Sequence, residues 1–283
     1  MPELPEVETV VRGLRQTVLG QTIEDLSLNA PPASVFVSAS FGDESLPNII
    51  IGRRITSVDR RGKNILISLT GKMTLWVHLK MTGHFYYRER STPLDKHDLV
   101  VFYLRPENRA PGKMSLRFND YRRFGRLRLF YNRELWQQDG LKELGPEPLE
   151  LTRGDFVLLC KSAKRMIKPA LLDQSFIAGL GNIYADESLY ASRIHPTRVT
   201  SSLSTPKLVE LHGQIRRLLK MAIRKMGTSV DSFSGVNGNP GEFQKYLKVY
   251  GNEGNPCLRC GRLIVRQRIG ARSAHFCPRC QRA

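Results

Sequence analysis

The most specific pattern in the 283-residue sequence is a set of four cysteines near its end. Cys257 and Cys260 form one C-x2-C pair, and Cys277 and Cys280 form a second pair sixteen residues later. Each pair can bind a metal from a tight turn, and four thiolates satisfy the tetrahedral preference of Zn²⁺. The pattern predicts a zinc ribbon, with four unrelated thiols or two disulfides as the alternatives.

The role of this metal follows from the ligand set. Because all four positions are thiolates, no coordination position remains open for a water molecule, so one structural Zn²⁺ is expected. The residues between the two pairs alternate enough to form a β-hairpin, and they include several arginines that a small rigid hairpin would present to phosphates.

A second group with chemical potential stands at the other end, in MPELPEVE. A small residue at position two usually allows Met1 to be removed, so we expect the mature chain to begin with the secondary amine of Pro2. Glu3 and Glu6 supply carboxylates close behind it. Pro5 suits a first helical turn, and apolar residues follow at helical spacing at Val7, Val10, Val11, Leu14 and Val18. The alternative is that Pro2 only sets where the chain starts.

The charge balance indicates the class of partner. Lys plus Arg number 44 against 26 Asp plus Glu, a formal net charge of +18, which favours a polyanion. No apolar run approaches the ~20 residues of a membrane span, so no membrane partner is expected. The acidic N-terminus does not resemble a signal peptide, so a cytoplasmic, reducing location is expected. A merely soluble basic protein is the alternative.

The elements that must position these groups fall into an α+β pattern. Residues 22–131 read mostly as short strands rich in β-branched and aromatic residues, which predicts an antiparallel sandwich or barrel with the first helix against it. RPENRAPGKM, residues 105–114, is expected to be an exposed hairpin tip. The predicted strands cover residues 65–69, 74–79, 84–88, 99–104, 115–118 and 126–131.

The pattern changes at Pro146 and Pro148, which mark a linker. Helices are predicted after it at residues 152–163, 168–174, 184–192 and 205–226, then a Gly- and Ser-rich loop at 227–241 and a short helix near 242–248. Cys160 lies in an apolar helical stretch and is expected in a core. The predicted domains are 1–145 (β domain), 146–151 (linker), 152–250 (helical domain) and 251–283 (zinc ribbon).

Three motifs together resemble one family. PELPEVE, the helical segment IKPALLDQSFIAGLGNIYADESLY (167–190) and the four-cysteine ribbon are similar to formamidopyrimidine-DNA glycosylase, a base-excision enzyme with a helix–two-turn–helix motif. The resemblance extends over nearly the whole chain, and the motifs stand in the same order. The related endonuclease VIII typically has Gly at the position of Leu4, so Leu4 favours a resemblance to formamidopyrimidine-DNA glycosylase. The resemblance implies an N-terminal β-sandwich catalytic domain and double-stranded DNA with oxidised bases or abasic sites as the partner.

The resemblance also implies the catalytic residues. Pro2 would attack C1′ of the damaged nucleotide to form an iminium ion, with Glu3 as the acid–base partner and Glu6 orienting the site. Lys63, in RRGKNIL, would contact a phosphate and assist elimination. Arg272, in IGARSAHF, would contact the phosphates flanking the lesion and act in the final elimination.

The remaining residues implied by the resemblance bind DNA. His78 and His97 would touch phosphates, although His78 could equally be a structural histidine. An enzyme that flips a base must fill the gap, and the resemblance implies Met81, Arg122 and Phe124 for this, from MTG and NDYRRFGR. Sheet core is the alternative for Met81 and Phe124.

In the helical domain, GLGNIY allows a tight turn leading into a helix whose N–H groups, with Asn182, would receive a phosphate. Lys164, Arg165 and Lys168 are expected to face DNA. The sequence departs from the family pattern where Lys80 replaces a common glycine and where Glu242 replaces a frequent aromatic residue.

The activity implied is bifunctional: excision of oxidised purines, chiefly 8-oxoguanine and formamidopyrimidines, followed by β,δ-elimination at the abasic site. The alternatives are an endonuclease VIII-like preference for oxidised pyrimidines and a non-catalytic binder of damaged DNA. Pro2, Glu3 and Lys63 together argue against the binder, since binding alone needs no terminal amine. A monomer is expected, because no heptad pattern or apolar surface stripe is evident.

Overall fold

The structure is a computed structural model that describes residues 1–29, 36–38, 46–107, 112–229, 233, 235–236 and 238–282. The centre of the 105–114 hairpin tip and part of the 227–241 loop therefore lie outside the described residues. The chain divides into two compact units, Met1–Lys142 with Met226–Gly241, and Glu143–Lys225 with Glu242–Ala283. The Gly-rich loop thus belongs to the first unit, whereas the predicted linker and the separate ribbon domain remain predictions.

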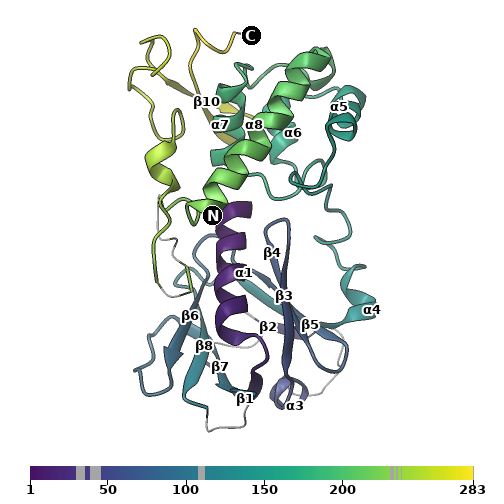
Figure 1. Cartoon of the computed structure of the whole chain (residues 1–283), viewed down its shortest axis with the longest axis vertical. Helices are drawn as coiled ribbons and strands as arrows, with labels where there is room; N and C mark the ends of the chain where they lie inside the picture. The colour runs from purple at the N-terminus through teal and green to yellow at the C-terminus, as the bar shows by residue number, and fades with distance from the viewer. Residues whose placement is uncertain are drawn as a thin grey trace. The chain divides into compact units, whose positions relative to one another are not determined.

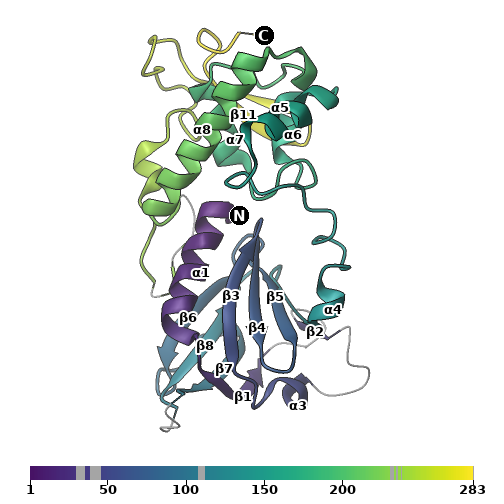
Figure 2. The ribbon, with the colours of Figure 1, turned by 45° about the vertical axis from the view of Figure 1, so that its right-hand side comes forward.

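Two sheets and a long helix build the first unit (Figures 1 and 2). Strand order in the four-stranded sheet is β1-β7-β8-β6, and in the five-stranded sheet β2-β9-β5-β4-β3. The strands are β1 Thr22–Leu28, β2 Phe36–Ser38, β3 Ile55–Arg61, β4 Asn64–Leu69, β5 Met73–His78, β6 His84–Glu89, β7 Asp98–Arg105, β8 Met114–Asn119 and β9 Arg126–Tyr131. Two short helices, α3 Leu46–Ile50 and α4 Asn132–Leu135, complete the unit.

The predicted α+β fold with its antiparallel sandwich is confirmed, with one difference. The three-residue edge strand β2 pairs parallel with β9, while the other strand pairs of the two sheets are antiparallel. β2 and β9 lie far apart in the sequence, so no hairpin turn imposes the antiparallel direction on them.

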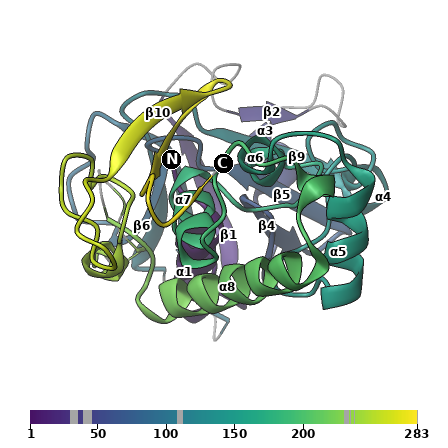
Figure 3. The same cartoon turned by 90° about the horizontal axis from the view of Figure 1, so that it is seen from above.

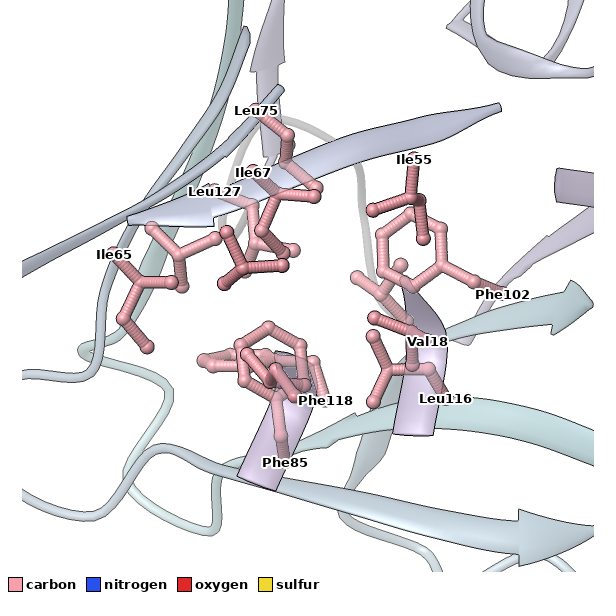
Figure 4. Close-up of a cluster of buried hydrophobic side chains, with 14 of the residues drawn as sticks. Val18, Ile55, Ile65, Ile67, Leu75, Phe85, Phe102, Leu116, Phe118 and Leu127 are labelled. Atoms are coloured by element: carbon pink, nitrogen blue, oxygen red, sulfur yellow. The ribbon is translucent and has the colours of Figure 1, made fainter. Parts of the chain in front are cut away.

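The helix α1, Leu4–Val18, and the inner faces of both sheets share one core. Every apolar residue predicted for one face of this helix is buried. Figure 4 shows Val18 of α1 near Phe102 and Leu116 of one sheet, while Ile65 and Leu127 come from the other. The 3.6-residue spacing of α1 and the alternation of the strands therefore direct their apolar side chains to the same interior.

The second unit is helical and ends in a hairpin (Figure 3). Its helices are α5 Arg153–Ser162, α6 Ile167–Leu172, α7 Asn182–Ala191 and α8 Thr205–Arg224, with 3-10 turns η1 Thr200–Ser202 and η2 Phe243–Tyr246. The hairpin strands are β10 Val265–Ile269 and β11 Arg272–Phe276. Cys160 is fully buried on α5, as predicted. Among the described residues, no helix is long and apolar enough to cross a membrane.

Candidate active site and nucleic-acid interface

The N-terminal residues form a buried acidic site. Pro2 is buried, and Glu3 and Glu6 are only 3% and 2% exposed. The backbone N–H of Glu3 donates to Oε2 of Glu6 at 2.8 Å, as in a capping box, which fixes the chain direction at the first turn of α1. A carboxylate there also suits the positive end of the helix dipole.

Glu6 also holds the start of the Gly-rich loop. Its Oε1 accepts a hydrogen bond from the backbone N–H of Thr228 at 2.7 Å. Gly227, with φ +80°, permits this approach, because a Cβ there would lie 2.9 Å from the same Oε1 atom. The carboxyl group of Glu6 therefore joins the N-terminal segment to the start of the Gly-rich loop.

Lys63 lies in a two-residue hairpin turn between β3 and β4, where Arg61 pairs with Asn64. The side chain of Arg60 pairs with Glu8 of α1 at 3.2 Å and also donates to the carbonyl of Gly62 at 3.0 Å. Lys63 is 6% exposed. The Arg60–Glu8 pair thus ties the turn that carries Lys63 to α1, at the same end of the unit as the N-terminus (Figures 1 and 2).

His78 ends β5, opposite Asn64 of β4 and Arg126 of β9. Burial, with the positive charges of Lys80 and Lys63, lowers the pKa of His78 to about 3. The backbone N–H of Lys80 donates to Nδ1 of this ring at 2.9 Å, which places the proton of the neutral ring on Nε2. His78 is therefore a neutral donor, partly open to solvent, at the ends of three neighbouring strands and close to the cations Lys63 and Lys80.

Two loops at this end of the sandwich lie next to each other. Residues 79–83 connect β5 to β6, and residues 120–125 connect β8 to β9. β5 pairs with β9 in one sheet and β6 pairs with β8 in the other, so both loops cross between the same two strand pairs. The registers His78↔Arg126 and His84↔Asn119 flank the two loops directly.

The predicted wedge residues lie exposed on these loops. Met81 is 43% exposed and Phe124 is 47% exposed, so the alternative that they belong to the sheet core is wrong. Arg122 is exposed, with its guanidinium 4.8 Å from the centre of the Phe124 ring. The structure thus brings Met81, Arg122 and Phe124 to one end of the sandwich.

His97 lies beside the second loop. Its backbone carbonyl accepts a hydrogen bond from the N–H of Asp120 at 3.0 Å, and its ring meets the Tyr121 ring at 6.3 Å between centroids. The side chain is partly exposed. His97 is therefore positioned at the same loop as Arg122, although 25 residues separate the two in sequence.

The helix–two-turn–helix segment is organised by Gln174. Its Oε1 accepts from the N–H of Gly179, and its Nε2 donates to the carbonyls of Leu172 and Leu180, each at 2.9 Å. Gly179 has φ +85°, which suits glycine at the turn. α7 then begins at Asn182, whose Oδ1 is buried and accepts no hydrogen bond within the described structure.

The prediction for Lys168 needs a correction. Its side chain is fully buried, and its Nζ donates to Oδ1 of Asp186 and to the carbonyl of Ser273, both at 2.5 Å. A buried ammonium is retained because it is paired and hydrogen-bonded, so this lysine is structural and does not face DNA. Lys164 is exposed, and Arg165 pairs with Asp173 at 2.7 Å.

The four ribbon cysteines form one cluster. Their Sγ atoms all lie within 4.8 Å of one another, with Cys257 and Cys280 at 3.9 Å and Cys260 and Cys277 at 3.5 Å. Zn–S bonds of ~2.3 Å in a tetrahedron place the sulfurs about 3.8 Å apart, so the cluster fits one Zn²⁺. The predicted structural zinc is thereby supported, and the alternative of unrelated thiols is wrong.

Polar contacts hold the ribbon and the segment directly before it against α7. Oδ2 of Asp186 accepts from the backbone N–H of His275 at 2.9 Å, and Oε1 of Glu187 accepts from the N–H groups of residues 248–250. Arg259 donates to the carbonyl of Tyr190 at 2.6 Å. Arg272, at the start of β11, is exposed beside the hairpin turn.

Several residues that shape the site were not predicted from the sequence. Asp120, Glu8 and Asp186 are acidic residues inside basic or helical motifs and would have been assigned to solvent. The N-D-x-x-x-x-G spacing around Asp120 is a signal for a turn closed by an aspartate side chain, and it could have identified that residue.

Comparison with known proteins supports the resemblance to formamidopyrimidine-DNA glycosylase. Three family models match: the formamidopyrimidine-DNA glycosylase N-terminal domain at residues 1–127, its H2TH domain at 144–234, and a zinc finger found in FPG and IleRS at 254–283. The formamidopyrimidine-DNA glycosylase of Heliobacterium modesticaldum is 44% identical, over 100% of both chains.

Solved structures of proteins bound to DNA are also similar to this chain. A variant of the Lactococcus lactis FPG protein bound to Fapy-dG-containing DNA aligns with a TM-score of 0.89 and 33% identity over 100% of both chains. The wild-type Lactococcus lactis protein, in complex with DNA containing an oxidised pyrimidine, aligns with a TM-score of 0.87 and 33% identity over 100% of both chains.

The β-sandwich with its buried acidic N-terminus, joined in one chain to a helix–two-turn–helix unit and a four-cysteine zinc ribbon, defines a zinc-containing DNA glycosylase. The chain belongs to the formamidopyrimidine-DNA glycosylase family.

Proposed function

We propose that this chain excises oxidised purines from duplex DNA with Pro2 as the nucleophile, after Met1 has been removed. The observation that carries the proposal is the buried N-terminal segment, in which Glu6 fixes both the backbone of Glu3 and the start of the Gly-rich loop. A segment held in this way keeps the amine of Pro2 in one place, as an attack on C1′ requires.

An N-terminal amine suits this chemistry. The reference pKa of a terminal amine is about 8, against about 10.4 for lysine, so roughly a tenth of it is neutral at pH 7. The neutral nitrogen forms the bond to C1′ while the bond from C1′ to the base breaks, and the base leaves with the bonding electron pair. The nitrogen then loses its proton, and opening of the C1′–O4′ bond of the sugar gives the iminium ion. Glu3, directly beside Pro2, would give a proton to the departing sugar oxygen or base.

Strand cleavage would follow from the iminium ion. We propose that Lys63 contacts a phosphate near the lesion and assists the first elimination, since its turn is tied to α1 by the Arg60–Glu8 pair. Arg272 would contact the flanking phosphates and act in the final elimination from the exposed hairpin tip.

The proposed DNA contacts fall into two groups. Phosphates would be bound by His78 and His97 in the first unit and by Lys164, Asn182 and the N–H groups of α7 in the second. Met81, Arg122 and Phe124 would enter the duplex, because they are large, exposed and gathered at one end of the sandwich. Zn²⁺ holds the ribbon and takes no part in the chemistry.

A wider substrate range is the second candidate. The Lactococcus lactis protein has been captured with DNA containing an oxidised pyrimidine. We propose oxidised purines as the main substrates and oxidised pyrimidines as weaker ones.

The bacterial relatives, whose DNA lies in the cytoplasm, favour a cytoplasmic location. We also propose a monomer, which sedimentation with and without DNA would test.

Borohydride trapping tests the proposal. A duplex with one 8-oxoguanine opposite cytosine is incubated with the zinc-loaded protein and borohydride, and mass spectrometry locates the adduct. A covalent complex at Pro2 is the expected result. The proposed nucleophile is wrong if the adduct maps to a lysine, and a non-catalytic binder is indicated if oxidised purines, oxidised pyrimidines and an abasic site all fail to trap.

A further inference from the structure

The two loops that carry the proposed wedge residues share one buried carboxyl group. Asp120, the first residue of the second loop, is 0% exposed, and its Oδ1 accepts a hydrogen bond from the hydroxyl of Thr82 in the first loop. Thr82 is 4% exposed. This contact joins segments 38 residues apart in the chain.

The same carboxyl group also shapes its own loop. Oδ2 of Asp120 accepts from the backbone N–H of Gly125 at 2.7 Å, and Oδ1 accepts from the N–H of Arg122 at 3.2 Å. These bonds close the turn that holds Arg122 and Phe124 outward. Asp120 therefore accepts three hydrogen bonds, two from its own loop and one from the loop that carries Met81.

A second feature brings the loops together independently of Asp120. A Cβ on Gly83 would lie 2.9 Å from Cζ of Phe118, and a Cβ on Gly125 would lie 2.5 Å from the same atom. Both loops thus pass directly over one buried phenyl ring, and only glycine permits either approach. The loops have a common floor as well as a common hydrogen-bond acceptor.

We infer that Asp120 is a positioning residue that makes the Met81 loop and the Arg122–Phe124 loop a single insertion device. The side chains that enter the duplex are then presented together, and the ordering of one loop orders the other. Binding a device that is already assembled costs less conformational entropy than ordering two independent loops on DNA. This inference rests on the proposed function, because it explains how the side chains that fill the gap left by the flipped base are held in place.

The side chain of Thr82 offers a matched pair of variants. Thr82→Val keeps the shape and removes the hydrogen bond to Asp120, whereas Thr82→Ser keeps the hydroxyl. Insertion is followed by stopped-flow fluorescence of 2-aminopurine placed beside an 8-oxoguanine opposite cytosine. We expect Thr82→Val to slow insertion by about fivefold or more, and Thr82→Ser to stay within about twofold of wild type.

A double-mutant cycle tests the coupling itself. Met81→Ala and Phe124→Ala, alone and combined, are measured in the wild-type and the Thr82→Val background. If the two loops act as a single device, the insertion rate lost in the double variant differs from the product of the two single losses in the wild-type background. The two losses should multiply when the Thr82 hydrogen bond is absent. Losses that multiply in both backgrounds would overturn the inference.

Two controls separate this inference from the rest of the argument. The lyase rate on a preformed abasic site should change less than the excision rate of a paired lesion, because no base has to be expelled. Equal loss of both rates in Thr82→Val, or a lowered melting temperature that accounts for the loss, would mean a general structural role. Failure of the wild-type protein to trap on any lesion would reject the proposed function and leave the loop coupling measurable by fluorescence.

Discussion

The carboxyl group of Glu6 lies between two backbone N–H groups that are 225 residues apart, those of Glu3 and Thr228. One oxygen serves each, at 2.8 and 2.7 Å. A residue at the first turn of a helix thereby controls the position of the N-terminal segment and of the loop that follows α8.

Glu6→Gln should weaken this arrangement. A glutamine offers one acceptor oxygen, so one of the two N–H groups must face an amide NH2, and we expect a loss of about 1–3 kcal/mol in the free energy of unfolding. Excision should fall more than DNA affinity does. Urea unfolding and single-turnover excision measure the two effects, with the exposed Glu150→Gln as control. An unchanged excision rate would show that Glu6 has no role in excision.

Lys168 and Lys164 should behave in opposite ways. Lys168→Met leaves Asp186 buried without its cation, and we expect a loss of about 3–5 kcal/mol in unfolding free energy. Lys164→Ala should leave stability within about 0.5 kcal/mol and lower the slope of log affinity against log salt by about one. Thermal unfolding and binding titrations over a salt series measure both. A stable Lys168→Met protein with a reduced salt slope would restore Lys168 as a DNA contact.

The partly buried His78 predicts a pH dependence of stability. Burial beside Lys80 and Lys63 lowers its pKa from 6.5 to about 3, so between these values the unfolded chain binds more protons than the folded one. This contribution is fully present above pH 6.5 and is lost as the pH falls towards 3. Between pH 7 and pH 5 wild type should lose about 1–2 kcal/mol more than His78→Gln. Equal losses in urea unfolding at the two pH values would show that His78 titrates normally.

Zinc removal should act on the second unit. The four cysteines and the apolar residues around them form a small core with Tyr190 and Val249, so chelation should unfold the ribbon and release Arg272 from its hairpin. We expect loss of DNA binding and one zinc released per chain, measured with a chromogenic chelator. Readdition of Zn²⁺ should restore binding. Binding that survives complete zinc loss would exclude a role for the ribbon.

Cys160 supplies the matched control for that experiment. Burial raises its pKa to about 12, so its thiol should resist alkylation in the folded, zinc-loaded protein. Iodoacetamide should modify the four ribbon cysteines only after chelation, and Cys160 only after global unfolding. Peptide mass spectrometry distinguishes these sites. Early modification of Cys160 would mean that α5 opens locally.

Lys80 has a backbone conformation that favours glycine, with φ +54°. Burial and the charges of Arg126 and Arg128 also lower its pKa, which indicates a crowded cationic surface. Lys80→Gly should raise the unfolding free energy by up to about 1 kcal/mol and reduce the salt slope of DNA binding. Unfolding and titration measure the two changes, and Lys72→Gly, which also removes a lysine at positive φ, is the control. A salt slope that Lys80→Gly leaves unchanged would show that Lys80 does not contribute to DNA binding.

Most of the fold could be predicted from the sequence, because its elements have local causes. The buried apolar residues of α1 have helical spacing, and the six predicted strands lie within two residues of the observed ones. The cysteine spacing alone predicted the ribbon. The parallel pairing of β2 with β9 has no local cause, since it depends on how a distant edge strand returns to the sheet.

The site was predictable where a motif carries the chemistry and not where tertiary burial decides it. Lys168 reads as one more cation in a basic stretch, and only the fold places Asp186 and Ser273 against its ammonium group. Asp120 reads as a turn residue, and its contact with Thr82 requires the sheet register that brings two loops together. Contacts of this kind, between residues far apart in the sequence, cannot be predicted from residue spacing.

The strand order around the two loops also limits how the chain can diverge. Both loops span the same gap, from the His78↔Arg126 register to the His84↔Asn119 register. A one-residue insertion in a flanking strand would reverse every side chain beyond it, and a longer loop would displace its tip from its neighbour. Relatives that keep this sandwich should therefore change the lengths of the two loops only together.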